Sequence, residues 1–127
     1  MGFPAAKQGD QIVATDFHVV IPPSGTPSPV PLPFTGVIDN KLSTDVKIEG
    51  MYAATVGSTA TNSPSHIPPA GSFQTPPMNR GEIITGSTSV FISGKSAARS
   101  TDTAKTCNDP TDLPVGKVVA ASTVLIG

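Results

Sequence analysis

Ser96-Ala97-Ala98-Arg99-Ser100-Thr101-Asp102 is the stretch that decides the fold, because two related stretches occur earlier in the chain. They are Pro4-Ala5-Ala6-Lys7-Gln8-Gly9-Asp10 and Tyr52-Ala53-Ala54-Thr55-Val56-Gly57-Ser58. In each stretch, a pair of alanines is followed directly by a polar residue. A unit that is used three times predicts a body with approximate three-fold symmetry.

The similarity extends upstream of the alanines in the second and third copies. Val46-Lys47-Ile48-Glu49-Gly50 aligns with Val90-Phe91-Ile92-Ser93-Gly94, and both read as a short strand ended by a glycine turn. A second strand is expected to start at the alanines. The first copy lacks an upstream strand, but Ser122–Gly127 at the other end of the chain resembles one. We therefore expect residues 124–126 to pair with residues 4–7 and to leave no open sheet edge there.

Composition points to an all-β domain. The chain has 127 residues, including 14 Pro and 12 Gly, with many Ser, Thr and Val. These residues favour short strands joined by turns over helices. The predicted fold is a single all-β domain over residues 1–127, a small pseudo-three-fold body of short strands with proline-rich loops and no substantial helix.

Two proline-rich stretches separate the repeats. Pro22–Pro33 and Pro64–Pro77 are expected to be ordered surface loops, since proline cannot donate to a central strand. Residues 22–45 are interpreted as an insertion and residues 64–79 as a proline-rich loop. Further strands are expected over residues 34–38, 81–86 and 115–119.

Each repeat is followed by one residue that could bind zinc. His18 lies twelve residues after Ala6, His66 twelve after Ala54, and Cys107 nine after Ala98. Imidazole and thiolate suit a tetrahedral structural zinc site, so the repeats predict that these three side chains converge on one ion. The fourth ligand is left open, with Asp109, Asn108, a backbone carbonyl or water as alternatives. Without the repeats, the three residues would read as ordinary core or surface positions.

Charge and motifs exclude several functions. Eight basic residues balance nine acidic ones and there is no Trp, so nucleic acid is not expected as a partner. Gly94-Lys95-Ser96 lacks the first glycine of a phosphate-binding loop, and there is no Gly-x-Ser-x-Gly elbow. The N-terminus shows no signal-peptide pattern. The protein is therefore predicted not to be an enzyme.

The alanine-pair repeats resemble those of the PAAR family, named for its proline-alanine-alanine-arginine repeat. The resemblance covers most of the chain outside Pro22–Asp45, although no copy spells the full motif. It implies a β-cone with a metal held near its sharp end by His and Cys, and it places His18, His66 and Cys107 on ligand positions. Such proteins cap the trimeric β-helical spike of contractile injection machines, namely type VI secretion systems, phage tails and related particles.

The resemblance also implies partners and a location. We expect a metal-braced tip that binds one trimeric spike and helps to pierce the target membrane, with effector cargo as a further partner. It would be made in the bacterial cytoplasm without a signal peptide and be delivered outside the cell on the particle. The alternative is a free-standing zinc-binding β-module, either a small hydrolase or a carbohydrate binder.

Overall fold

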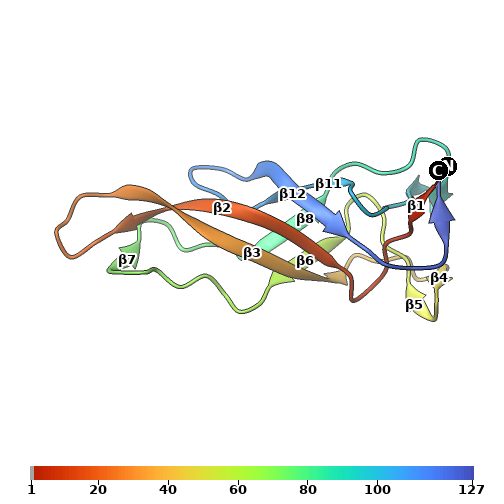
Figure 1. The fold of residues 1–127 in the computed structure, drawn as a ribbon, viewed down its shortest axis with the longest axis horizontal. Coiled ribbons are helices and arrows are strands. Elements are labelled where there is room, and N and C mark those ends of the chain that lie inside the picture. Colours follow the sequence, from red (N-terminus) through yellow and green to blue (C-terminus); the bar gives the residue numbers. More distant parts are fainter. Residues whose placement is uncertain (1) are drawn as a thin grey trace.

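The computed structural model describes residues 2–127, which form strands and turns with no helix (Figure 1). The all-β prediction is confirmed. In chain order the strands are Phe3–Pro4 (β1), Gln11–Ile21 (β2), Ser28–Asn40 (β3), Lys47–Ile48 (β4), Met51–Tyr52 (β5), Thr59–Asn62 (β6), Ser72–Phe73 (β7), Arg80–Ile83 (β8), Phe91–Ile92 (β9), Lys95–Ser96 (β10), Thr103–Thr106 (β11), Leu113–Val119 (β12) and Leu125–Ile126 (β13).

Six antiparallel strands close into a small barrel. Their order is β12-β11-β8-β6-β3-β2, and β2 pairs back onto β12 through Val13↔Lys117 and Gln11↔Val119. β7 extends the sheet at the far end of β2, opposite Val20 and Ile21. Closing the sheet on itself leaves no open edge along this part of the barrel.

The long hairpin of β2 and β3 forms one side of the barrel and continues beyond it (Figure 1). Alternate residues of β2 face inward, because successive side chains of a strand point to opposite faces. Ile12 and Val20 are buried, and Asp16 and His18 are buried on the same face between them. The strand period therefore places two polar side chains inside the molecule.

The proline-rich stretch contains a strand, so the prediction of a surface loop over residues 22–33 is wrong from Ser28 onward. The N–H of Thr35 donates to Asn62 Oδ1 (2.9 Å), and its carbonyl accepts from the N–H of Ser63 (3.2 Å). The odd-numbered residues of β3 thus direct their backbone groups away from β2. Pro29, Pro31 and Pro33 share this parity, so the ladder with β2 loses no donor at these positions.

The three alanine pairs form a closed ring of backbone hydrogen bonds. Ala6 N–H donates to Ala98 O (3.0 Å), Ala98 N–H to Ala54 O (3.1 Å), and Ala54 N–H to Ala6 O (3.0 Å). All six alanines of the pairs are fully buried, so a larger side chain at any of these positions would collide with a neighbouring repeat of the same chain. The predicted approximate three-fold symmetry is present at the level of individual hydrogen bonds.

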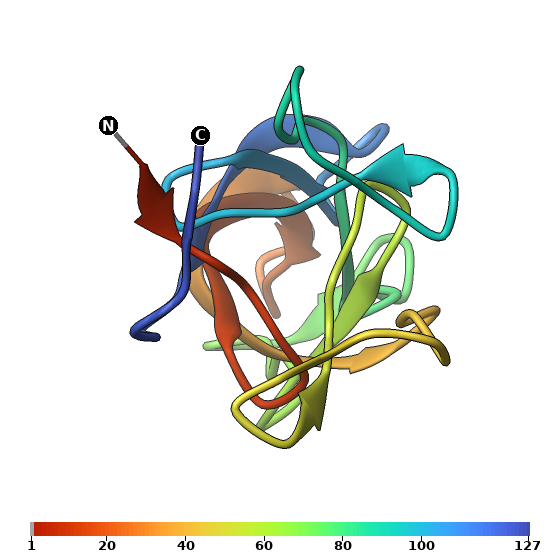
Figure 2. The same cartoon turned by 90° about the vertical axis from the view of Figure 1, so that its right-hand side faces the viewer.

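A short two-stranded antiparallel ladder accompanies each alanine pair, and the three ladders surround the centre of one end of the molecule (Figure 2). They are β1 with β13, β4 with β5, and β9 with β10, and together we call them the base. β5 and β10 end just before the alanines, which make single bridges to neighbouring copies instead. The prediction that a second strand starts at the alanines is wrong for this reason.

The C-terminal strand completes the first repeat, as predicted. Phe3 pairs with Ile126 and Pro4 with Leu125. The N–H of Ala5 donates to Val124 O (2.8 Å), as Ala53 does to Val46 and Ala97 to Val90 (3.0 Å each). Beneath the base, one Ala and one Ile from each repeat form a small core layer, with the isoleucines at 48, 92 and 126. A second cluster inside the barrel contains Phe34 and several Ile, Val and Ala side chains.

Candidate metal centre

Asp16 and His18 enter the site from β2. Two residues apart on one strand, they share its inward face, and both are almost fully buried. Asp16 Oδ1 accepts from the Thr106 hydroxyl and lies 3.4 Å from Asn108 Nδ2. Its other oxygen, Oδ2, faces His66 and Cys107.

His66 lies in the loop between β6 and β7 and is held by two asparagines. Its backbone N–H donates to Asn79 Oδ1 (2.8 Å), while Asn62 Nδ2 lies 3.3 Å from its Nδ1. Asn62 also donates to Asn79 Oδ1 (3.1 Å). The opposite ring nitrogen, Nε2, is 3.0 Å from Asp16 Oδ2. This network directs the imidazole inward even though it belongs to a loop.

Cys107 follows β11 directly and is buried. Its Sγ lies 3.4 Å from Asp16 Oδ2. Burial raises the pKa of the Cys107 thiol to about 11, and the negative charge of Asp16 adds to this effect. The metal-free site therefore favours the thiol form, whereas a bound cation would favour the thiolate.

The structure brings all three sequence-predicted residues together. One ligand atom from each of Asp16, His18, His66 and Cys107 lies within 4.8 Å of the others. We call these four residues the donor group. The rings of His18 and His66 are 5.0 Å apart between centroids, and Phe73 packs edge-on against His18 at 5.8 Å. The side chains come from three well-separated parts of the chain.

His18 shows that the donor group suits a metal ion. Within residues 2–127, neither of its ring nitrogens has a hydrogen-bond partner, although the residue is only 1% exposed. A buried polar atom without a partner is costly, and a metal bond would satisfy one of the two nitrogens. Two imidazoles, a thiolate and a carboxylate are donors that a tetrahedral divalent ion accepts. The residues present therefore fit a metal.

Asp109 and Asn108, two of the alternatives for the fourth ligand, lie outside the donor group. Asp109 Oδ2 is 3.6 Å from His18 Nδ1, beyond hydrogen-bond distance, and it accepts from the N–H of Val19 (2.8 Å). Asn108 contacts Asp16 rather than the centre of the group. The residue that sequence reasoning missed is Asp16. The alternation of β2 could have revealed it, because Asp16 shares the parity of His18.

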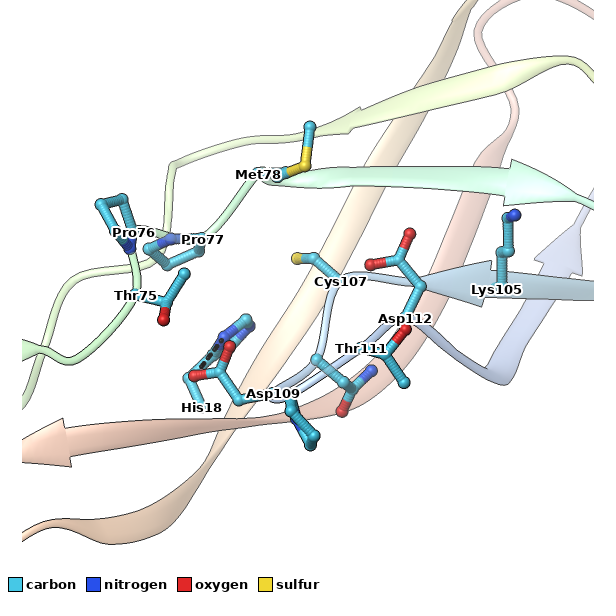
Figure 3. Close-up of a pocket in the computed structure, with 12 residues that line it drawn as sticks. His18, Thr75, Pro76, Pro77, Met78, Lys105, Cys107, Asp109, Thr111 and Asp112 are labelled. Atoms are coloured by element: carbon cyan, nitrogen blue, oxygen red, sulfur yellow. Dashed lines mark ion pairs between the residues drawn. The ribbon is translucent and has the colours of Figure 1, made fainter.

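A cavity of about 370 Å³ reaches the donor group from one side. His18 and Cys107 form part of its wall, together with the prolines at 76, 77 and 110 (Figure 3). Asp109 and Asp112 project from the loop between β11 and β12 into the same region. The cavity thus borders two of the four donor residues, although their side chains are almost fully buried.

The donor group lies between the barrel and the free end of the β2–β3 hairpin. Beyond His18, β2 continues for the residues 19–21, and the turn of residues 22–27 follows. The outermost point of the molecule is therefore this turn (Figure 1). The expectation of a metal near the sharp end needs this correction, because the proline-rich hairpin extends past the site.

Comparison with known protein families gives a match. The family model described as the PAAR motif matches residues 34–104, which is more than half of the chain. The matched segment contains the second and third repeats and His66, whereas His18 and Cys107 lie outside it. A comparison with curated proteins finds no match. No helix among the described residues is long and apolar enough to span a membrane.

Proposed function

The chain belongs to the PAAR-motif family, and we propose that it is the metal-braced tip of the spike of a contractile injection machine. The role is structural rather than enzymatic. The family match supports a spike-tip role, and the pseudo-three-fold base is the observation that carries the proposal for this chain. A monomer with three equivalent two-stranded ladders can present one ladder to each subunit of a trimer.

The base supplies a surface for that partner. Phe3, Phe91 and Leu125 are 44%, 60% and 61% exposed there, although they are large apolar side chains. Leu125 and Phe91 occupy equivalent positions of their two-stranded ladders, and Lys47 occupies that position in the third ladder. Apolar groups exposed together on one end of a molecule are typical of an interaction site. We infer that the base docks on a trimeric spike, one chain per trimer.

The proposed metal is a structural zinc ion held by Asp16, His18, His66 and Cys107. Four donors would fill a tetrahedral shell and leave no position for a reacting water, as in structural sites. Zinc binding in zinc-finger peptides is worth about 10–16 kcal/mol apparent, and it appears as folding free energy. Here it would connect β2, the loop containing His66 and the end of β11. The free end of the β2–β3 hairpin, which has little apolar core, would gain the most stability from the metal.

The end opposite the base suits entry into a membrane. Residues 17–38 and 50–79 contain no Asp, Glu, Lys or Arg, and the outermost turn and β7 belong to these segments. Ionised side chains are costly to transfer into a lipid bilayer, so an uncharged end meets a lower barrier. We propose that this end leads during injection. The chain would be made in the bacterial cytoplasm and leave the cell on the particle, with or without effector cargo.

A free-standing zinc-binding module remains the second candidate, either a small hydrolase or a carbohydrate binder. The cavity beside His18 and Cys107 is the observation that favours it, because a ligand there would approach the metal. A completed four-donor shell argues against hydrolysis. Turnover of a substrate that is lost with a chelator would support this candidate.

The experiment is reconstitution of the chain with the trimeric spike protein of its own injection machine. Native mass spectrometry should give one chain per three spike subunits. Phe91→Asp combined with Leu125→Asp should abolish the complex, because two charges would be buried in the interface. Ile67→Asp is the matched control, since Ile67 is 73% exposed and lies near Pro33 and Thr35 of β3 rather than in the base. A chain that stays monomeric beside the intact trimer contradicts the proposal.

A further inference from the structure

The two residues after Cys107 run along β2 on either side of His18. The N–H of Asp109 donates to Phe17 O (2.9 Å), and the N–H of Phe17 donates to Asn108 Oδ1 (2.7 Å). The N–H of Val19 donates to Asp109 Oδ2 (2.8 Å). These bonds join the strand residues before and after His18 to a single short segment, which fixes the position of the segment relative to the imidazole.

We propose that Asp109 is a positioning residue for His18 in the metal centre. Its Oδ2 lies 3.6 Å from His18 Nδ1, and Nδ1 has no hydrogen-bond partner among the described residues (Figure 3). A histidine that binds a metal through one nitrogen usually donates its other N–H to a carboxylate or carbonyl, which fixes the tautomer and the ring orientation. Asp109 is the carboxylate in that place. With a metal bound, Nε2 would accordingly be the ligating nitrogen, and Nδ1 would keep its proton and face Asp109. The 3.6 Å between Nδ1 and Asp109 Oδ2 would have to shorten by a few tenths of an ångström for a hydrogen bond to form.

Asn108 acts in the same way on the other ligand of β2. Its Nδ2 lies 3.4 Å from Asp16 Oδ1 and donates to the carbonyl of Thr106 (3.1 Å). Together with the Thr106 hydroxyl, it occupies Oδ1 and leaves Oδ2 directed toward His66 and Cys107. The tripeptide Cys107-Asn108-Asp109 thus supplies one ligand and the groups that orient two others. Neither role was evident from the sequence, where both side chains were alternatives for the fourth ligand.

The inference rests on the proposed zinc site, and the test begins with the wild-type chain. Zinc affinity is measured by competition with a chromophoric chelator for wild type, Asp109→Asn and Asp112→Asn. Asp109→Asn retains an oxygen for the Val19 N–H but removes the charge, so we expect affinity to fall about 10- to 100-fold, as for other groups of this kind. Asp112 is the matched control, because it is an exposed carboxylate of the same loop and lines the same cavity. Asp112→Asn should bind zinc within about twofold of wild type.

A second readout separates positioning from a general effect on folding. Long-range ¹H–¹⁵N spectra of the zinc-loaded wild type should show His18 protonated at Nδ1 and bound at Nε2. A His18 bound at Nδ1 would overturn the inference without any variant. Unchanged affinity in Asp109→Asn, or an equal loss in Asp112→Asn, would overturn it as well. A wild-type chain that binds no zinc would instead remove the proposed metal centre itself.

Discussion

Asp16 illustrates what a single residue contributes to this fold. It is a carboxylate with no exposed surface, and both of its oxygens have polar neighbours. The repeats revealed His18, His66 and Cys107 because each follows an alanine pair at a similar spacing. Asp16 has no counterpart at the equivalent positions of the other repeats, so that comparison could not find it. Only the alternation of β2, which was not predicted as a strand, places it beside His18.

Replacing Asp16 with Asn tests its role as the fourth donor. The amide has the shape of the carboxylate but lacks its charge, so we expect zinc affinity to fall by at least about tenfold. Zinc content after dialysis and the chelator competition both measure this. Asp39→Asn, an exposed change on the neighbouring strand β3, should leave the affinity unchanged. Full zinc occupancy in Asp16→Asn would exclude Asp16 as a ligand.

Glu49 makes a surface contact that depends on pH. The backbone N–H and the hydroxyl of Thr123 both donate to Glu49 Oε2, at 2.9 Å and 2.8 Å, and they lower the pKa of this carboxyl below its usual 4.5. Because the pKa of Glu49 is lower in the folded state, ionised Glu49 stabilises the fold above pH 4.5. This stabilisation is lost as the pH falls through the pKa that Glu49 has in the folded state. Glu49→Gln should therefore be less stable than wild type at pH 7 and equal to it in strong acid. Urea unfolding at both pH values measures the difference, and a gap that persists in acid would contradict this account.

Among the elements, β13 was predictable, whereas β3 was predicted only in part, over residues 34–38. Ser122–Gly127 resembles the strands that precede the second and third alanine pairs, so pairing with the incomplete first repeat followed from the sequence. Residues 28–33 of β3 were predicted as a loop because each proline was judged only by the backbone donor that it lacks. Whether the missing N–H of a proline weakens a sheet depends on whether that N–H would point toward a paired strand. The sequence does not show which strands flank β3 or at which residues they pair with it.

Ile126 and Leu125 provide a matched pair on β13. Ile126 is 5% exposed in the core layer under the base, whereas Leu125 is 61% exposed. Ile126→Ala should lower the free energy of unfolding by about 2–5 kcal/mol. Leu125→Ala should change it by about 0.5 kcal/mol or less. Denaturant titration measures both, and equal effects would mean that β13 does not complete the base.

At the scale of the whole molecule, the two ends are held by different interactions. The base depends on the ring of alanine hydrogen bonds and on the Ala–Ile layer. Each repeat contributes one hydrogen bond to the ring and one Ala and one Ile to the layer. Toward the opposite end, Asp16 contacts His66 and Cys107, and we propose that a metal ion joins these segments. The sequence predicted the three-fold repeat because its contacts recur along the chain. It did not predict the closed barrel, since the β12–β2 pairing joins distant segments that no local pattern links.

Removal of the metal should therefore loosen one end of the molecule. With a chelator present, amide hydrogen exchange is expected to accelerate about tenfold or more around residues 16–20 and 66, because the ligands no longer restrain these segments. The amides of Ala6, Ala54 and Ala98 should keep their protection. Hydrogen-exchange mass spectrometry resolves the two regions, and uniform acceleration over the chain would contradict a two-part molecule.

The most direct test of the metal-braced tip is the native mass of the chain purified without added metal, measured beside His18→Ala. We expect one zinc ion per wild-type chain and loss of the ion in the variant, since the ring nitrogens of His18 have no hydrogen-bond partner within residues 2–127 and one of them would be lost as a ligand. A wild-type chain that folds stably with no metal, or a His18→Ala chain that keeps a full complement of zinc, would contradict it.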